Sequence, residues 1–181
     1  MATALTHAYI GVLLAPLAPA GLPRRLLYVA LVLLAVLPDA DLIGDVFGVP
    51  YAHELGHRGF THSLLFAAFA GGAGAWFVRR HGVEAVRDRI RLAAVFALAT
   101  ASHGILDALT DGGKGVGFFI PLSNERFFFP WRPLRVVPLE LDRLQVTRIG
   151  DILRSELLWV WVPATAIAVA ARLTRRARRS S

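Results

Sequence analysis

The stretch LAAVFALATASHGILDAL, residues 92–109, decides the fold class of this chain. It is apolar over most of its length, and it places His103 and Asp107 four residues apart near its end. Residues at positions i and i+4 share one face of a helix, and Asp111 continues that face if the helix extends so far. An unpaired imidazole and carboxylate are costly to bury. A divalent metal accepts both ligand types, so the stretch predicts an apolar helix with a metal-binding end.

Apolar segments recur along the whole chain and predict a membrane protein with a single domain over residues 1–181. Hydrophobic residues make up 55% of the chain, and the mean hydropathy is +0.53. The expected helices cover residues 8–17, 26–37, 64–78, 92–109 and 157–171. Most are shorter than the ~20 residues that span a bilayer, and Pro16, Pro38 and Pro163 are expected to limit or kink individual helices. The expected fold is all-α, a polytopic bundle of about five apolar helices with a metal site at one membrane face.

The distribution of charge predicts how the bundle is oriented. If Arg24 and Arg25 lie in the cytoplasm, alternation of the helices places the linker 79–91 and the basic tail 172–181 there too. That side then holds twelve of the twenty basic residues and two of the thirteen acidic ones, a net charge of +10 against −3 opposite. This is the positive-inside pattern. It predicts a multi-pass inner-membrane protein with an extracytoplasmic N-terminus and metal site and a cytoplasmic C-terminus.

The other metal-type side chains stand at the ends of the other apolar segments, and the same alternation brings all of them to the outer face. They are His7, Asp39 and Asp41 in LPDAD (37–41), and His57 and His62 in GHRGFTHS (56–63). The chain has no cysteine, so a zinc site here must use histidine and carboxylate ligands. A turn after Pro38 and an N-cap at Thr61 are simpler explanations. These two explanations do not account for the gathering of all the ionisable groups at one membrane face, where such groups are functional candidates.

Residues 112–155 are expected to form a long outer loop, rich in glycine and in aromatic side chains. The aromatic residues are expected to rest at the level of the lipid headgroups; the alternative is a lid or a lipid-facing wall over the site. The net charge of +7 raises the possibility of a nucleic-acid partner. No basic stripe with interleaved aromatic residues is present, so the expected partner is the lipid bilayer and no nucleic acid is expected.

Three segments resemble the YdjM-type family of membrane-bound, metal-dependent hydrolases: LPDAD (37–41), GHRGFTHSLL (56–65) and SHGILDALT (102–110). The family pattern is LPDxD, GHRGxTHS and SHxxxDxLT in that order, with a histidine near the N-terminus, and the resemblance covers about residues 1–135. That family is distantly similar to the all-helical superfamily of zinc phospholipase C and single-strand nucleases.

The resemblance implies a ligand set. One of Asp39 and Asp41, one of His57 and His62, and both His103 and Asp107 would share one metal. His7 and a bridging Asp107 would hold a second. A third site is not expected, since only Asp111, Glu140 and Asp142 remain for it and no histidine follows His103.

The expected function is hydrolysis of a phosphoester, such as that of a lipid, by a metal-activated water, with about one or two zinc ions as cofactor. Asp107 and Arg58 are the expected catalytic residues. Arg58 could neutralise a phosphate by a bidentate contact; the alternative is an arginine anchored in lipid headgroups. The hydroxyls of Thr61, Ser63 and Thr110 are expected to orient the ligands.

Two other functions remain open. His53-Glu54-Leu55-Gly56-His57 matches the H-E-x-x-H signature of zincin proteases. Pro50, Gly56 and Gly59 disfavour the helix that this signature requires, so the match is interpreted as coincidence, with His53 and His81 as surface residues. The third possibility is a non-enzymatic membrane protein whose metal is structural, which would lack an open coordination position.

Overall fold

The computed structural model describes residues 1–138 and 146–180, and within these residues the regular secondary structure is helical, with no β-strand. The elements are α1 (Ala4–Leu13), η1 (Ala15–Leu17), α2 (Arg24–Val36), η2 (Leu37–Leu42), α3 (Ile43–Val46), η3 (Phe60–His62), α4 (Leu64–Val78), η4 (Arg79–His81), α5 (Val86–Ala108), α6 (Val146–Glu156), η6 (Leu157–Trp161) and α7 (Val162–Ser180). The η elements are 3₁₀ turns except η6, which is a π-helical turn. The expected all-α fold is confirmed.

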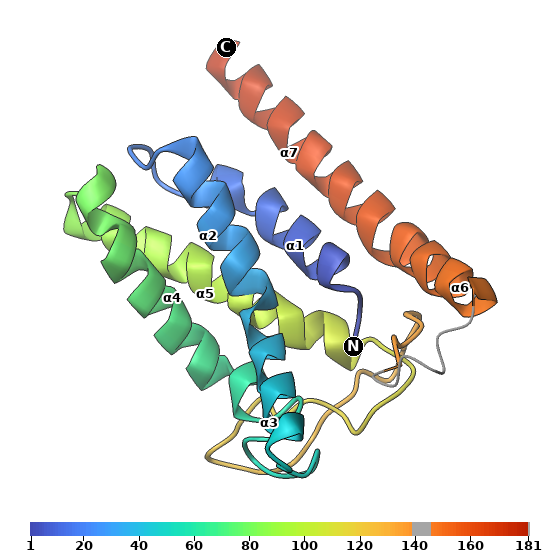
Figure 1. The fold of residues 1–181 in the computed structure, drawn as a ribbon. Coiled ribbons are helices and arrows are strands. Elements are labelled where there is room, and N and C mark those ends of the chain that lie inside the picture. The colour runs from blue at the N-terminus through green and yellow to red at the C-terminus, as the bar shows by residue number, and fades with distance from the viewer. Residues whose placement is uncertain (139–145, 181) are drawn as a thin grey trace.

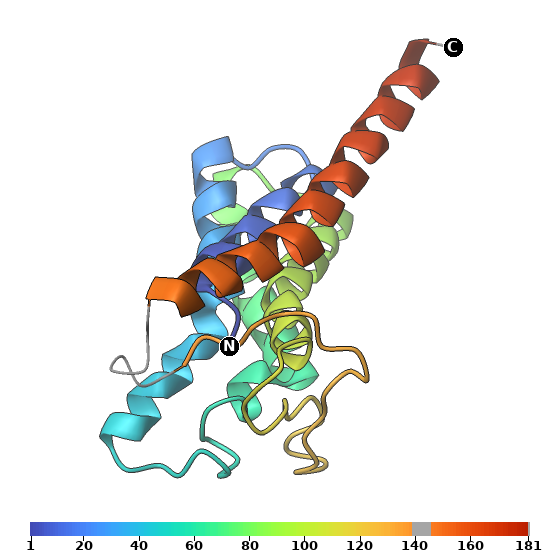
Figure 2. The same ribbon diagram turned by 90° about the vertical axis from the view of Figure 1, so that its right-hand side faces the viewer.

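The helices run alternately up and down, so that the connections gather at two ends of the bundle (Figure 1). One end carries the α1–α2 connection, the α4–α5 turn and the end of α7. The other carries the N-terminus, α3, and the long connections around residues 47–63 and 109–138. Elements α6, η6 and α7 form one continuous rod whose last turns diverge from the other helices (Figure 2).

Small residues let the helices approach closely. Helix α4 packs along α5, and α1 packs along α2. A Cβ atom on Gly71 of α4 would lie 2.4 Å from the backbone nitrogen of Ala97 on α5, a distance that real Cβ atoms do not reach. The core between α2, α4 and α5 contains Leu31, Leu92 and Phe96, all fully buried. Burial of such side chains contributes about 1.5–3 kcal/mol each.

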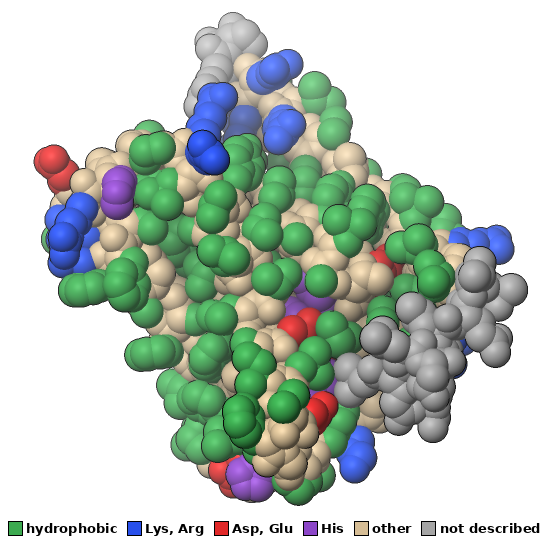
Figure 3. Space-filling view, viewed as in Figure 1, with side chains coloured by type: hydrophobic (Ala, Val, Ile, Leu, Met, Phe, Trp, Pro, Cys, Tyr) green, Lys and Arg blue, Asp and Glu red, His purple; other side chains and the backbone are tan. Residues whose placement is uncertain are grey.

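The outer surface is apolar, as a lipid-exposed bundle requires. Among residues 1–138 and 146–180, three helical stretches are long and apolar enough to cross a membrane, Arg24–Val46, Val86–Ala108 and Arg148–Arg178, and Ala4–Leu17 is a shorter apolar helix. Large hydrophobic side chains such as Leu33, Phe69, Phe77 and Ile167 are exposed on it. Figure 3 shows hydrophobic side chains over most of one face, with Lys and Arg at the upper left and top.

The structure differs from the sequence prediction in the last part of the expected outer loop. Residues 112–138 are irregular, but α6 begins at Val146, so the final residues of the predicted loop 112–155 are helical. Arg148, Asp151 and Arg154 recur every three residues, which is also compatible with an amphipathic helix. Because these charged residues interrupt the apolar ones, residues 146–156 do not form an apolar segment in the sequence. The remaining residues 139–145 of the predicted loop lie outside the described part of the chain.

The orientation of the bundle in the membrane stays a prediction and has a direct test. We expect a reporter that is active only in the cytoplasm to be active when fused to the C-terminus, because the arginine-rich end should face the cytoplasm. The same reporter should be inactive when inserted at Leu122, which is 91% exposed in the connection at the opposite end. Activity of the Leu122 insertion together with an inactive C-terminal fusion would place the histidine-rich end in the cytoplasm.

Candidate metal centre

Histidine and aspartate side chains from four segments converge at one end of the bundle. Asp39 of η2, His62 of η3, and His103 and Asp107 of α5 each offer a ligand atom, and these four atoms lie within 4.8 Å of one another. A second group consists of Asp41, His57 and His62. The i, i+4 spacing on α5 places His103 and Asp107 on one helix face, as the sequence predicts. The sequence left open which of Asp39 and Asp41, and which of His57 and His62, share a site with His103 and Asp107. Asp39 and His62 lie in that four-residue group, and His62 belongs to the second group as well.

The ring of His103 is oriented by the end of α2. Its Nδ1 lies 2.8 Å from the carbonyl oxygen of Ala35 and donates to it, so in the neutral ring Nε2 carries the lone pair. Pro38 explains why this carbonyl is available, since Pro38 has no N–H to give it in the 3₁₀ turn that follows. Nε2 then faces Oδ1 of Asp39 at 3.2 Å. Two acceptors facing each other at this distance are suited to a cation between them.

The ring of His62 is held in the same manner from the opposite side. Its Nδ1 lies 3.1 Å from Oδ2 of Asp41, and its buried Nε2 has no hydrogen-bond partner. That Nε2 lies 3.9 Å from Oδ1 of Asp39 and 3.7 Å from Oδ2 of Asp107. Burial lowers the pKa of His62, and its contact with Asp41 offsets this only in part, so the ring is neutral at pH 7. A neutral imidazole tied back through one nitrogen is the usual form of a metal-binding histidine.

Asp41 organises the loop between α3 and α4. Its Oδ1 accepts from His57 Nδ1 at 2.8 Å, and its Oδ2 accepts from Thr61 Oγ1 at 2.7 Å and from the backbone N–H of Arg58 at 3.1 Å. Together with the His62 contact to Oδ2, these bonds engage both carboxylate oxygens. Asp41 therefore fixes the orientation of two histidine rings and of the turn between them.

Asp107 is paired with a fully buried arginine. Arg58 donates from Nε to Asp107 Oδ2 at 3.0 Å, and its two terminal nitrogens donate to the carbonyl of Gly112 and to Thr110 Oγ1. The φ angle of Arg58 is 62°, a left-handed conformation that costs a non-glycine residue about 1–3 kcal/mol. The loop accepts this strain at the residue that brings a cation to Asp107.

His7 completes the cluster from α1. Its ring stacks on that of His103, with centroids 3.6 Å apart and an interplanar angle of 7°. Its Nε2 lies 3.6 Å from Asp107 Oδ1, and neither of its buried ring nitrogens has a hydrogen-bond partner. Asp107 thus presents one oxygen toward His7 and the other toward His62. This arrangement is compatible with the bridging position that the family resemblance implies for Asp107.

The charges of the cluster fit a divalent cation. Among the described side chains, the carboxylates of Asp39, Asp41 and Asp107 face one buried cation, Arg58, which leaves these side chains with two negative charges in excess when the histidines are neutral. Charges buried without compensation are costly. The partnerless nitrogens of His7 and His62 have the lone pairs that such an ion needs. Imidazole and carboxylate together suit zinc, for which no thiolate is required.

Several residues make contacts other than those the sequence predicts. Arg58 was expected to bind phosphate or headgroups, but its guanidinium is buried and donates to protein oxygens only. Ser63, expected to orient a ligand, instead caps α4 by accepting from the N–H of Phe66. Thr61, whose alternative was that cap, bonds to Asp41 as expected of an orienting hydroxyl. Thr110 holds Arg58 in place and so acts on Asp107 indirectly.

The remaining candidates stand apart from the cluster. Asp111 accepts from Arg135 and from the backbone of Val136. Partial burial raises its pKa, but these bonds outweigh that effect and hold the pKa below its usual value. Glu140 and Asp142 lie outside the described residues. His53, Glu54 and His81 are exposed, and residues 51–59 form turns, so the helix that a zincin motif requires is not formed.

Glu156 is a site residue that the sequence analysis missed. Its buried carboxylate accepts from the N–H of Thr3 at 2.5 Å, and from the hydroxyls of Thr3 and Thr6 at 2.6 Å each. Trp161, one π turn later, donates to Thr6 Oγ1 at 2.7 Å. These bonds attach α1 to the C-terminal rod at Thr6, one residue before His7. A separate bond, from the N–H of Ala2 to Asp107 Oδ1 at 2.8 Å, joins the segment before α1 to the cluster. The only available signal was an acidic residue directly before the apolar segment 157–171.

Replacing Glu156 with alanine should loosen the attachment of α1. Three donors would lose their buried acceptor, and each such loss costs about 1–3 kcal/mol. We expect a lower thermal unfolding temperature in detergent, and weaker zinc binding because His7 is displaced. Glu125→Ala, which removes an exposed carboxylate, is the control. Unchanged stability and zinc affinity in Glu156→Ala would show that this attachment does not position His7.

Comparisons with known proteins identify similar proteins of the inner membrane. The sequence profile of the YdjM inner membrane protein family matches residues 1–178. The chain is also 42% identical over 164 residues to Inner membrane protein YbcI of Escherichia coli (strain K12), which covers 90% of this chain and 92% of that protein. No solved structure matches the chain. The match reaches beyond about residue 135 and includes the rod that carries Glu156.

Proposed function

The chain belongs to the YdjM inner membrane protein family, and on this premise we propose that it is a membrane-bound, metal-dependent hydrolase of phosphoesters. The observation that carries the proposal is the convergence of Asp39, His62, His103 and Asp107. Their ligand atoms lie close together. The other ring nitrogen of each histidine, Nδ1, contacts a protein oxygen, on Ala35 for His103 and on Asp41 for His62. Such preorganisation is typical of metal sites.

The proposal assigns a role to each set of residues. Asp39, His62, His103 and Asp107 would hold a first divalent ion, and His7 with Asp107 would hold a second. When bound, such ions supply Lewis acidity, which promotes ionisation of water near neutral pH and stabilises charge on a phosphoester. Asp41 orients His57 and His62, and Arg58 offsets the charge of Asp107 without reaching the substrate.

The surroundings of Asp39 favour a lipid substrate. Asp39 is the one member of the four-residue group that is not fully buried, with 13% of its side chain exposed. Leu37 and Ile43, its neighbours in the chain, are exposed apolar residues. Figure 3 shows acidic and histidine side chains in the middle of the otherwise hydrophobic face. A molecule that reaches the cluster here comes from an apolar phase, which suits the phosphoester of a phospholipid.

The test is a hydrolysis assay on the purified, zinc-loaded protein. Phosphatidylglycerol in mixed micelles and p-nitrophenyl phosphate serve as the lipid and the generic phosphoester. We expect phosphoester hydrolysis that a chelator abolishes, with the lipid preferred. Hydrolysis of neither compound by a protein that retains its zinc would contradict the proposal and favour a structural metal.

Two exposed residues distinguish this function from a protease. Glu54 accepts from Asn124 Nδ2, and His53 lies in a turn, so neither touches the cluster. We expect Glu54→Gln and His53→Ala to keep zinc content and hydrolysis near wild type. His57→Ala, which removes a ring bonded to Asp41, should abolish at least one of them. If Glu54→Gln lost activity with metal still bound, the result would contradict this proposal and favour the zincin protease hypothesis.

A further inference from the structure

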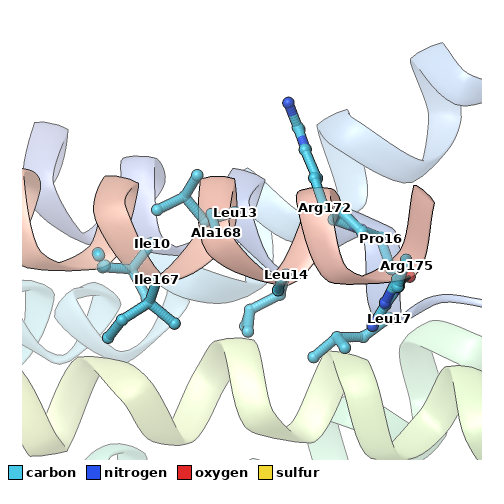
Figure 4. Close-up of a pocket in the computed structure, with 11 residues that line it drawn as sticks. Ile10, Leu13, Leu14, Pro16, Leu17, Ile167, Ala168, Arg172 and Arg175 are labelled. Atoms are coloured by element: carbon cyan, nitrogen blue, oxygen red, sulfur yellow. Dashed lines mark hydrogen bonds between the residues drawn. The ribbon is translucent and has the colours of Figure 1, made fainter. Parts of the chain in front are cut away.

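An apolar groove lies between α1 and α7. It begins at Ile10 and runs toward the C-terminal end of α1, away from the metal cluster. It has a volume of about 280 Å³ and is lined by α1, η1 and the C-terminal rod. Figure 4 shows Leu14, Leu17 and Ile167 pointing to the same side of this helix pair, with Ala168 beside them. The groove is close to the lower limit of about 300 Å³ for small-molecule sites. Its lining offers no polar side chain between Ile10 and Leu17.

The mouth of the groove carries arginines that pair with no acidic side chain of the described residues. Arg172 and Arg175 line it, and Arg175 donates from Nη1 to the carbonyl oxygen of Pro16 at 3.1 Å. Arg91 donates from Nε to the carbonyl of the next residue, Leu17, at 2.8 Å. Within residues 1–138 and 146–180, none of these three guanidinium groups forms an ion pair with a carboxylate. The groove therefore joins an apolar trough to a cationic rim.

We propose that this groove is a binding site for an anionic phospholipid, separate from the metal centre. One acyl chain lies along Leu14, Ile167 and Ala168, and the phosphate lies against Arg175, which sits beside Pro16 and Leu17 (Figure 4). Arg172 points to the other side of the helix pair and adds positive charge near the same end of the groove. The ligand must be amphiphilic, because the groove is apolar and its rim is charged. It must be anionic, because no carboxylate in the described part of the chain pairs with the arginines of the rim. Arginine is suited to phosphate since its guanidinium offers several donors in one plane.

The position of the groove indicates that a lipid bound there is not the substrate of the metal centre. The groove reaches η1 and the second half of α7, at the arginine-rich end of the bundle, whereas the metal cluster includes residues of the last turns of α5, which end at the opposite end (Figure 1). A headgroup held by the arginines of the rim is thus remote from Asp39. The bound lipid would fill the space where the last turns of α7 diverge from α1, which would attach the C-terminal rod to the rest of the bundle.

Native mass spectrometry of the delipidated full chain tests the proposal. The probes are phosphatidylglycerol and phosphatidylcholine with the same acyl chains, added at equal concentrations. We expect the wild type to retain phosphatidylglycerol in preference to phosphatidylcholine by about tenfold or more, because juxtamembrane arginines attract anionic lipids. Arg172→Gln/Arg175→Gln should remove most of this preference. Arg80→Gln/Arg87→Gln, which removes equal charge from the same end outside the groove, should keep it.

A second pair of variants tests the apolar part. Ala168→Phe fills the groove and should weaken retention of both lipids several-fold, whereas Ala68→Phe, on an exposed face of α4, should not. Equal retention of the two lipids by wild type, or an equal loss of preference in both arginine pairs, would overturn the proposal. So would a dimer that retains no lipid and dissociates in Ala168→Phe, since a second copy of the chain would then occupy the groove.

Discussion

Replacing His62 with alanine is expected to remove nearly all bound metal while the protein remains folded. His62 belongs to the four-residue group, so its loss removes a ligand of the first ion together with one of the rings that Asp41 orients. Its Nε2 has no hydrogen-bond partner, so truncation leaves few protein contacts unsatisfied. Replacing residues that merely orient a ligand already costs about 10–100-fold in affinity, and we expect more than about 100-fold for the ligand itself.

The measurement is zinc content after dialysis against a weak chelator, with thermal unfolding to confirm the fold. His53→Ala and His81→Ala, at exposed histidines, are the matched controls. His103→Ala should behave like His62→Ala. Asp107→Ala is a poorer test, because it also leaves Arg58 buried without its carboxylate. Full zinc content in folded His62→Ala would show that the metal, if bound, lies elsewhere.

Removing the Arg58 side chain should cause the largest loss of stability. In Arg58→Met the carboxylate of Asp107 would remain buried without its cation, and breaking one side of a buried ion pair costs about 3–5 kcal/mol. Thermal unfolding in detergent, with a chelator present so that metal does not mask the effect, measures this loss. Arg132→Met removes an exposed arginine and should have little effect.

The paired variant separates charge from packing. Replacing both members of a buried pair by apolar residues is often neutral, so Arg58→Met/Asp107→Leu should unfold at a higher temperature than Arg58→Met alone. The double variant should nevertheless bind little metal, because Asp107 is a ligand in the four-residue group. If Arg58→Met were as stable as wild type, the ion pair would contribute nothing to the fold.

The features that follow from local patterns could be predicted from the sequence. The i, i+4 spacing of His103 and Asp107 requires only a helix, and α5 provides it. The gathering of the ligands at one end follows from alternation of the apolar segments, whatever their packing. Pro38 marks the change from α2 to the 3₁₀ turn that carries Asp39 and Asp41.

The contacts that depend on distant parts of the chain could not be predicted. Arg58 meets Asp107 across 49 residues of sequence, and Glu156 meets Thr3 across 153. A sequence alone gives no distance between such positions, and the expectation for Arg58 was a contact with phosphate or lipid headgroups rather than a buried ion pair. The sequence also could not tell which of Asp39 and Asp41 belongs to the four-residue group. Two carboxylates that lie two residues apart in one turn can point to different sides.

The metal content of the wild-type protein tests the central claim most directly. The protein would be purified in mild detergent, freed of metal with a chelator, re-equilibrated with excess zinc and dialysed before elemental analysis. The four-residue group and the open nitrogens of His7 predict about one to two zinc ions per chain, with binding that raises the unfolding temperature. A folded protein that retains no zinc or other divalent metal, and whose unfolding temperature does not change, would contradict the account.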